Sequence, residues 1–477
     1  MAKKILALLL ILATLSLSAC APVLKDVTGI RPLSGKEKKE SGKEEISLPE
    51  GFCAGFARGC ISPDSFPVKL GNGNLAETVA DDLYATCVAL SDGENLVLLF
   101  AMDIKDVPSA FYEAALDRIT KSLPAPQENI LINGTHTHNC PHTSSSDYAC
   151  AVWRQKTVSV MAEVAREALE DLAPAEVFTG AAEAKDFAFV RRYLMKNGTY
   201  KGIQSANASG DYLSHETEAD PELRVIHFER GEKTDIILAN WQAHAAHAAS
   251  SYPNGISADF ISLLREGVES SFDAHFAYFN GASGNLNLTS YVGRQIYHSY
   301  REVGYALVDV VIKALETETP AKTGPLQVRS SLLPCFVRQD SAEKREMAKE
   351  IVNTAPGLRD GLVERYGFQS QYEAIAVNTR AGMDPVTEVP LFVIAFGDVS
   401  LTSNPFELFD TTAREIRAAS PFKMTFTCAY TNGSFGYMPP DEIFPHGEYE
   451  VYVSRFEAGT AEKCAEEILR MLHDAEN

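Results

Sequence analysis

The sequence has little that would suit nucleic-acid binding or a metal site built from cysteines. It contains 43 lysines and arginines against 64 aspartates and glutamates, giving a formal net charge of −21, and it has no long basic stripe. Because phosphate binding needs clustered lysine and arginine, this composition argues against a general nucleic-acid binder and indicates no more than solubility. The 9 cysteines include no Cys-x-x-Cys spacing, which disfavours a cysteine-based zinc site.

Two further features are missing, an internal repeat and a nucleotide-binding loop. The glycine-rich stretch at residues 281–287 is followed by no lysine and lacks the Walker spacing, so its glycines instead predict close backbone approach or positive φ. At 477 residues, with 45% hydrophobic and 22% charged residues, the chain has the composition of a globular protein with a large core. Length alone would allow two or three domains.

The first 20 residues form a targeting segment. Lys3 and Lys4 supply positive charge, and the apolar residues 5–15 that follow are too short for a confident membrane span. The ending Leu17-Ser-Ala-Cys20 resembles the lipobox of bacterial lipoproteins. It predicts cleavage before Cys20, a lipid on the Cys20 thiol, and attachment to the extracytoplasmic face of a bacterial cell membrane. The alternative is an ordinary secretory signal, which would release the protein.

Residues 21–50 predict a flexible linker, because they are polar and charged, with almost nothing to bury. The predicted folded domain then spans residues 51–477. With Cys20 set aside, eight cysteines remain, an even number in an exported chain where disulfides form. Cys53 with Cys60 is one pair near enough in sequence to bond, and Cys140 with Cys150 is another, but the connectivity stays open.

Three of the 11 histidines, His136, His138 and His142, fall within seven residues, directly after the apolar residues 129–132 that predict a buried strand. In extended backbone His136 and His138 point to the same side, with Cα atoms about 6 to 7 Å apart. That spacing suits one metal ligand and one catalytic neighbour. A polar loop whose histidines bond to nearby backbone is the alternative, but three histidines at a strand end favour a site.

A second histidine pair, His244 and His247, follows the predicted strand at residues 234–241. Two such endings predict one shared site. Hairpins are predicted at residues 87–102, 224–241 and 389–401, and helices at 109–121, 147–172 and 461–473. This alternation indicates a mixed α+β domain with largely antiparallel sheets at the centre and helices outside, and not a pure parallel sheet.

Arg191 and Arg192 lie side by side in a stretch that predicts a strand. Neighbouring strand residues face opposite sides, so at most one of the two would enter a site, while the other meets solvent. An arginine there would hold a carbonyl or carboxylate, or form a structural salt bridge. Glu407, at a predicted helix start, either favours the helix dipole or serves as a carboxylate ligand.

Together these strand ends resemble the catalytic domain of the neutral/alkaline non-lysosomal ceramidase family, in scattered motifs from about residue 51 to the C-terminus. Thr135-His-Thr-His138 with Pro141 resembles the family's Thr-His-Thr-His-Ser-Gly-Pro. Asn240-Trp-Gln-Ala-His244 is similar to the Asn-Trp segment that bears the second zinc histidine. Pro405-Phe-Glu407 resembles Pro-Gly-Glu, and Gly436-Tyr437 falls where the family places a zinc-ligating tyrosine.

The resemblance implies a Zn²⁺ site whose ligands are His136, His244, Glu407 and Tyr437, with His247 as the reserve for His244. It also implies that His138 and Arg191 contact substrate and stabilise the oxyanion, while zinc-activated water attacks an amide carbonyl. Asn287 occupies the position of a family serine near the reaction centre. The implied fold is one large domain, without the family's C-terminal immunoglobulin-like domain.

Three departures concern the substrate and leave the implied metal site intact. Asn285 and Asn287 replace the family's aspartate and serine, and Phe456 replaces a tyrosine in Arg455-Phe-Glu-Ala458. We therefore expect a membrane-tethered zinc amidase acting on an N-acylated lipid such as a ceramide. The alternatives are a zinc hydrolase of a soluble amide or ester, and a non-catalytic ligand-binding lipoprotein of the same fold.

Overall fold

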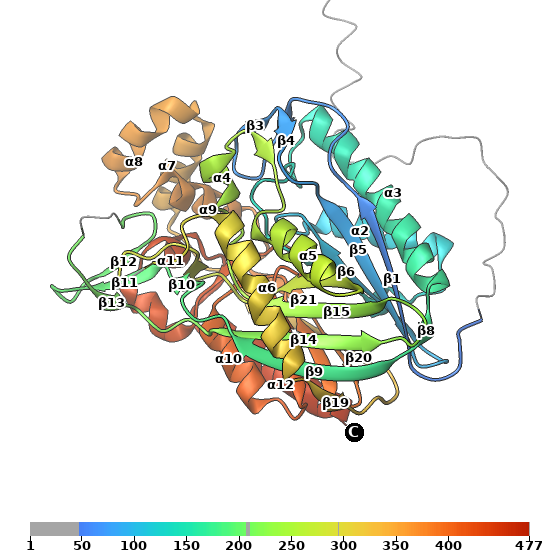
Figure 1. The fold of residues 1–477 in the computed structure, drawn as a ribbon. Coiled ribbons are helices and arrows are strands. Elements are labelled where there is room, and N and C mark those ends of the chain that lie inside the picture. Colours follow the sequence, from blue (N-terminus) through green and yellow to red (C-terminus); the bar gives the residue numbers. More distant parts are fainter. Residues whose placement is uncertain (1–46, 207–209, 294, 477) are drawn as a thin grey trace, which may run out of the picture.

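Three mixed β-sheets form the body of the protein (Figure 1). The computed structural model describes residues 47–206, 210–293 and 295–476. The first sheet has the order β7-β6-β5-β1-β8, with β1 (Cys53–Cys60), β5 (Tyr84–Ser91), β6 (Leu96–Met102), β7 (Ile130–Gly134) and β8 (Ala173–Pro174). The second has the order β17-β15-β14-β9-β19, with β9 (Glu176–Glu183), β14 (Glu222–Glu229), β15 (Asp235–Trp241), β17 (Ala274–Asn280) and β19 (Thr319–Ala321). The third has the order β20-β21-β22-β24, with β20 (Gln327–Phe336), β21 (Val386–Phe396), β22 (Val399–Ser403) and β24 (Met424–Cys428).

The same order of elements recurs in all three sheets. An antiparallel hairpin is followed by a helix and then by a strand parallel to the second hairpin strand. The three series are β5-β6-α2-β7, β14-β15-α5-β17 and β21-β22-α10-β24, with helices α2 (Ser109–Ser122), α5 (Phe260–Ser271) and α10 (Asp410–Ala419). The recurrence lies in the order of elements and not in visible sequence similarity. The α+β class is confirmed, and the three predicted hairpins are those that begin each series.

The inner strands of each sheet, such as β6, β15 and β22, are buried on both faces. In β6, Val97 and Leu99 join a central cluster to which all three sheets contribute, whereas Leu98 and Phe100 pack beneath α2 and α3 (Tyr148–Glu170). The matching outer helices are α5 and α6 (Tyr300–Glu316) on the second sheet, and α10 and α12 (Thr460–Glu476) on the third. Burial on both faces explains why residues 96–102 are hydrophobic without interruption.

Smaller elements lie around these sheets (Figure 1). One is a three-stranded sheet of β11 (Arg192–Met195), β12 (Tyr200–Gly202) and β13 (Tyr212–His215). In the chain, β20 is followed by helices α7 (Ala342–Asn353), α8 (Arg359–Tyr366) and α9 (Gln371–Ala381), and then by β21. Two further helices, α4 (Ala248–Ser251) and α11 (Tyr449–Val453), are short. Two-stranded pairs are β2 (Val68–Lys69) with β3 (Leu75–Ala76), β4 (Thr78–Val79) with β16 (Gly255–Ile256), β10 (Phe189–Val190) with β18 (Leu286–Asn287), and β23 (Glu407–Leu408) with β25 (Tyr437–Met438).

The cysteines of the described residues are all free thiols, so neither suggested disulfide forms. Cys53 and Cys60 stand at opposite ends of β1, which separates them by far more than a disulfide spans. Cys140 Sγ instead accepts a hydrogen bond from Lys105 N at 3.2 Å. These thiols serve mainly as small core residues.

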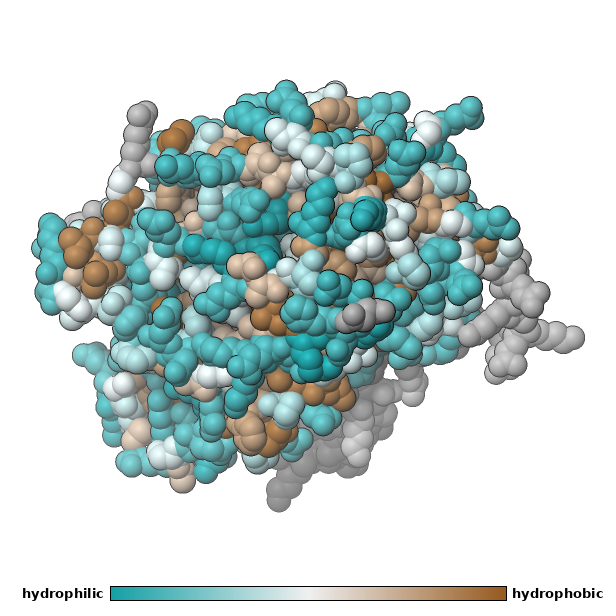
Figure 2. Space-filling view, turned by 90° about the horizontal axis from the view of Figure 1, so that it is seen from below, coloured by the Kyte–Doolittle hydropathy of each residue, from teal (hydrophilic) through white to brown (hydrophobic). Residues whose placement is uncertain are grey.

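The predicted targeting segment, with Cys20, lies outside the described residues, as does the linker as far as residue 46. Leu48, within the predicted linker, already packs against the core of the first sheet. Over the residues that the structure describes, no helix has the length and hydrophobicity to span a membrane. On the face shown in Figure 2, hydrophilic residues form most of the surface and hydrophobic residues form separate patches.

Candidate metal centre

Two histidines and a glutamate from distant parts of the chain come together at strand ends. His136 follows β7, His244 follows β15, and Glu407 begins β23. Nε2 of His136 lies 3.2 Å from Nε2 of His244. Glu407 Oε2 lies 3.5 Å from the first nitrogen and 3.4 Å from the second. The two histidine-bearing strand ends thus meet at one site, together with a carboxylate from more than 150 residues further along the chain.

Buried asparagines hold these strand ends in place. Asn133, in β7, donates from Nδ2 to Ala429 O at 2.6 Å, just beyond β24. Its Oδ1 accepts from the backbone N of Asn280, the last residue of β17, at 2.9 Å. Asn280 Nδ2 in turn donates to Thr135 O and Ala243 O, both at 3.2 Å. Amides buried in this way fix the register of the loops that carry His136 and His244.

The orientation of both imidazoles is set by backbone carbonyls. His136 Nδ1 lies 2.7 Å from Lys105 O, and His244 Nδ1 lies 2.8 Å from Ser283 O. A carbonyl acceptor requires the proton on Nδ1, which leaves the Nε2 lone pair facing the centre. His136 also has a positive φ of 66° and stacks on the Tyr430 ring at 3.9 Å between centroids. The strained backbone at His136 is therefore fixed by several surrounding contacts.

The spacing of these donors fits a tetrahedral metal ion. Bonds of about 2.0–2.2 Å to zinc place neighbouring donors of a tetrahedron about 3.3–3.6 Å apart. The three donor pairs here are 3.2, 3.5 and 3.4 Å apart. Glu407 Oε2 is buried and has no hydrogen-bond partner among the described residues, a costly state for a carboxylate oxygen unless a cation binds it.

The protonation states also suit metal binding. Burial lowers the pKa of His244 to about 3, and the positive charge of Arg191 acts in the same direction. Burial by itself would raise the pKa of Glu407, but the imidazoles of His136 and His244 outweigh it and hold that pKa well below its usual range. A neutral imidazole and an ionised carboxylate are the forms that bind a metal.

His138 is the third histidine of the cluster. Its Nε2 lies 3.3 Å from Nε2 of His136, and the donor nitrogens of His136, His138 and His244 all lie within 4.8 Å of one another. Unlike the other two, His138 has no hydrogen bond to Nδ1 within the described residues, so no carbonyl fixes its ring. Burial, followed by the positive charge of Lys105, lowers the pKa of His138 well below its usual value. His138 is therefore neutral at pH 7.

Tyr437 stands opposite Glu407, because β25 pairs with β23 in parallel. Arg191 Nη2 donates to the Tyr437 hydroxyl at 3.0 Å and to Gly284 O at 2.9 Å. Burial raises the pKa of Tyr437 well above its usual value, and the positive charge of Arg191 opposes that rise. Arg191 therefore orients the phenol beside Glu407 and favours its ionised form.

The expectation that one of the two arginines meets solvent is wrong. Arg191 and Arg192 are both buried, and both donate to Glu450, Arg191 Nε to Oε1 and Arg192 Nη1 to Oε2, each at 2.9 Å. The alternation fails because the predicted strand is broken at Arg191, between β10 and β11. A single buried carboxylate can then receive both guanidinium groups.

Replacing Glu450 by glutamine is expected to destabilise the protein by about 3–5 kcal/mol, because it leaves the buried Arg191 guanidinium without its carboxylate partner, while Arg192 keeps only its ion pair with Glu216. The measurement is the free energy of unfolding in urea. Glu170→Gln is the matched control, since Glu170 pairs with Arg166 on the exposed side of α3 and such pairs contribute little. Equal stability of the two variants would show that the Glu450 network has no such role.

Asn287 and His247 lie together but apart from the three-histidine cluster. His247 Nε2 lies 2.8 Å from Asn287 Oδ1 and 3.2 Å from Thr289 Oγ1. The structure therefore brings His244, and not the reserve His247, against His136. Asn285 is buried and bonds through Nδ2 to Asp410 Oδ1 at 2.7 Å, so it anchors the start of α10. His142, the third histidine of the sequence motif, accepts from Ser144 N at 3.2 Å outside the cluster.

Gly284 provides the close backbone approach that the glycine-rich stretch predicts. A Cβ at this position would lie 2.2 Å from Glu407 O and 2.8 Å from Glu407 C. Gly284 N also donates to Leu408 O at 2.8 Å. The glycine thus lets one loop pack directly on the backbone of the carboxylate ligand.

Gly284→Ala is therefore expected to displace Glu407 and weaken metal binding by about 10- to 100-fold, the range typical of changes around metal ligands. Competition with a chelator of known affinity measures this directly. Gly357→Ala is a suitable control, because a Cβ there meets no atom within 4 Å. Unchanged affinity in Gly284→Ala would contradict the proposed dependence on backbone approach.

Several residues of the site have no signal in the sequence. Tyr430 stacks on His136, and its hydroxyl lies 2.6 Å from Ser283 Oγ. Glu450, which holds Arg191, lies in a short helix that no strong periodicity predicts. The nearest signal for them in the sequence is the Asn-Gly turn after β24. Asn432 Oδ1 in this turn accepts a hydrogen bond from Ile132 N at 2.7 Å and so holds β7 in position.

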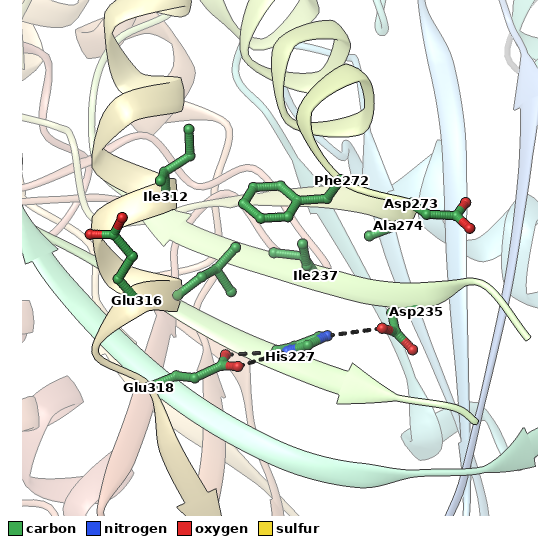
Figure 3. A pocket seen from close by; sticks show the side chains of 10 residues that line it. His227, Asp235, Ile237, Phe272, Asp273, Ala274, Ile312, Glu316 and Glu318 are labelled. Carbon is green, nitrogen blue, oxygen red and sulfur yellow. Dashed lines mark hydrogen bonds and ion pairs between the residues drawn. The ribbon is translucent and has the colours of Figure 1, made fainter. Parts of the chain in front are cut away.

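A separate hollow of about 470 Å³ on the second sheet contains none of these residues (Figure 3). His227, from β14, lies within it between two carboxylates. Its Nδ1 is 3.1 Å from Glu318 Oε1, and its Nε2 is 3.5 Å from Asp235 Oδ2. Within the residues that the structure describes, His227 and these two carboxylates do not bring their donor atoms together closely enough to form a second metal cluster.

Comparison with known proteins gives a fold likeness only. No family model matches the sequence, and no curated protein matches it. Among solved structures, neutral ceramidase from Pseudomonas aeruginosa has a TM-score of 0.68 at 15% identity, covering 89% of this chain and 74% of that one. A ceramidase complexed with C2 has a TM-score of 0.66 at 15% identity, covering 89% and 75%. The chain therefore has a ceramidase-like mixed α+β fold, with three histidines placed to bind a metal.

Proposed function

We propose that this chain is a zinc-dependent hydrolase that cleaves the C–N bond of an N-acyl amide. The observation that carries the proposal is the cluster of His136, His244 and the buried, unbonded Glu407 Oε2, spaced as tetrahedral ligands are spaced. Tyr437, beside Glu407, is the proposed fourth ligand. Two imidazoles, a carboxylate and a phenol oxygen suit zinc better than calcium or magnesium, which prefer oxygen ligands alone.

A zinc ion bound there would supply a water of lowered pKa and would polarise a carbonyl oxygen. The protein's own side chains would then determine how the substrate is held. His138 presents Nε2 to the cluster from a ring that is not fixed by a carbonyl, so it is placed to donate to the substrate oxygen as negative charge develops. Arg191 acts through Tyr437, since its Nε is bound to Glu450 and its Nη2 to Tyr437 and Gly284.

The substrate class rests on two supports. The fold neighbours are ceramidases, which favours an amide with a fatty acyl chain. A lipid on Cys20 would tether the enzyme to the outer face of a cell membrane, where an N-acylated lipid such as a ceramide is within reach. A soluble amide or ester is the second candidate, because Phe456 stands where the family that the sequence resembles has a tyrosine, and so lacks a phenol to bond to a lipid substrate.

The test is metal content followed by hydrolysis. The purified full chain should hold about one zinc per molecule, and a His136→Ala, Glu407→Ala double variant should hold none. Amides with long and short acyl chains then separate the two substrate candidates. Bound zinc without turnover of any amide or ester would favour a non-catalytic binding protein, and absence of zinc after reconstitution would contradict the hydrolase.

A further inference from the structure

Two positively charged side chains beside the histidine cluster have no carboxylate partner. Within the described residues, Lys105 Nζ forms no ion pair or hydrogen bond. Arg455 forms one side-chain bond, from Nη1 to Ser434 O at 3.1 Å. Both are half-buried. The chain has 21 more acidic than basic residues, so carboxylate partners are plentiful. A half-buried cation without such a partner is costly, and binding an anionic ligand would offset that cost.

Lys105 adjoins the histidine side of the cluster. Its carbonyl accepts from His136 Nδ1 at 2.7 Å. A Cβ on Gly71 would lie 3.2 Å from Lys105 Cδ and 3.4 Å from His138 O, so the lysine stem runs alongside the His138 backbone. The ammonium charge also acts on His138, whose pKa it helps to lower after burial.

Arg455 adjoins the carboxylate side. Its Nε would lie 3.5 Å from a Cβ on Gly436, whose carbonyl accepts from Glu407 N at 2.9 Å. Gly436 has a φ of 79° and no side chain, which lets the guanidinium lie close to the backbone next to Glu407.

Asp106, which follows Lys105 in the chain, is already occupied by neutral donors. It accepts from Ser434 Oγ at 3.1 Å and from the Thr143 hydroxyl. Its charge acts on Arg455 only at a distance, since no ion pair within 4 Å joins them in the described structure. Asp106 therefore holds the loop that carries Ser434, and the Arg455 guanidinium can still bind another anionic group.

We infer that Lys105 and Arg455 bind an anionic group of the substrate, so that the preferred substrate is an amide carrying a carboxylate near the scissile bond, as in an N-acyl amino acid. The planar fork of Arg455 suits the two oxygens of a carboxylate, and Lys105 adds a second charge. Hydrolysis breaks the amide C–N bond, forms a C–O bond to water, and releases a fatty or short carboxylic acid and an amino acid. This inference rests on the proposed amide hydrolysis at the same site.

The test compares two substrates that differ only in the anionic group, N-lauroylglycine and N-lauroylethanolamine. With the zinc-loaded full chain, kcat/KM is expected to be about 10- to 100-fold higher for the glycine compound, as charge-assisted hydrogen bonds imply. In Arg455→Gln that ratio should approach one, and Arg455→Lys should keep part of it. Arg118→Gln is the charge-matched control, on the exposed side of α2, and should keep the full ratio.

The same pair with acetyl in place of lauroyl distinguishes a lipid from a soluble source of the anion. Equal kcat/KM for the glycine and ethanolamine compounds, or a ratio unchanged in Arg455→Gln, would overturn the inference while leaving the hydrolase intact. If neither compound is hydrolysed, the proposed function fails, and calorimetric binding then decides this inference separately. Tighter binding of N-lauroylglycine that is lost in Arg455→Gln would support it, and equal binding would overturn it.

Discussion

Replacing Glu407 by glutamine is expected to abolish stable zinc binding and to lower kcat/KM for amide hydrolysis by about 10³-fold or more. The amide has nearly the shape of the carboxylate but no negative charge, and its nitrogen cannot act as the missing ligand. The rate estimate follows because a catalytic metal supplies several kcal/mol of transition-state stabilisation, and each 1.36 kcal/mol is tenfold.

The measurement pairs elemental analysis of the purified variant with steady-state kinetics. Glu442→Gln is the matched control, since Glu442 is exposed in the short 3₁₀ segment Asp441–His446 and should keep both zinc and activity. His136→Ala should reproduce the Glu407→Gln result, because the two side chains face each other at the proposed metal site, with His136 Nε2 3.5 Å from Glu407 Oε2. A Glu407→Gln protein with one zinc per chain and undiminished turnover would exclude Glu407 as a ligand.

The sequence predicts the elements that carry the site better than it predicts the contacts within it. The hairpins that become β5-β6, β14-β15 and β21-β22 follow from apolar runs separated by turns, which depend on local sequence alone. The prediction that His136 and His244 each follow an apolar strand also depends on local sequence alone. Their meeting depends on the packing of separate sheets, which no local pattern encodes.

The errors have the same origin. Strand alternation through Arg191 predicts that one of Arg191 and Arg192 meets solvent, but the strand is interrupted at Arg191 and both are buried. The burial of Arg192 depends on two carboxylates, Glu216 and Glu450, and Glu450, 258 residues away, accepts from both arginines. His247 is the reserve ligand in the prediction because the spacing from Trp241 to His244 differs by about one residue from that in the family that the sequence resembles. Only the contact with Asn287 places His247 elsewhere.

The recurring order of hairpin, helix and parallel strand explains why the ligands come from distant parts of the chain. In each series the second hairpin strand and the final strand run in parallel, so both end at the same edge of their sheet. Lys105 follows β6, His136 follows β7, His244 follows β15, and Glu407 follows β22. The central cluster packs the three sheets together, and their ends thereby supply one site.

His138→Ala is expected to lower turnover by about 10²- to 10³-fold, the cost of one lost oxyanion donor, while zinc stays bound. The reason lies in the difference between the histidines. His136 and His244 each have Nδ1 fixed by a backbone carbonyl, as metal-bound histidines usually do, and His138 has no such bond within the described residues. Its loss should therefore affect kcat more than zinc content.

Zinc content and kcat measured on the same preparation separate the possible roles of His138. His142→Ala is the control, because His142 belongs to the same sequence motif but lies outside the cluster. His138→Gln, which retains a hydrogen-bond donor, should recover part of the lost rate. Loss of zinc in His138→Ala in proportion to lost activity would make His138 a ligand, in place of the proposed Tyr437. Full activity with full zinc content would show that the substrate oxygen is stabilised by other groups.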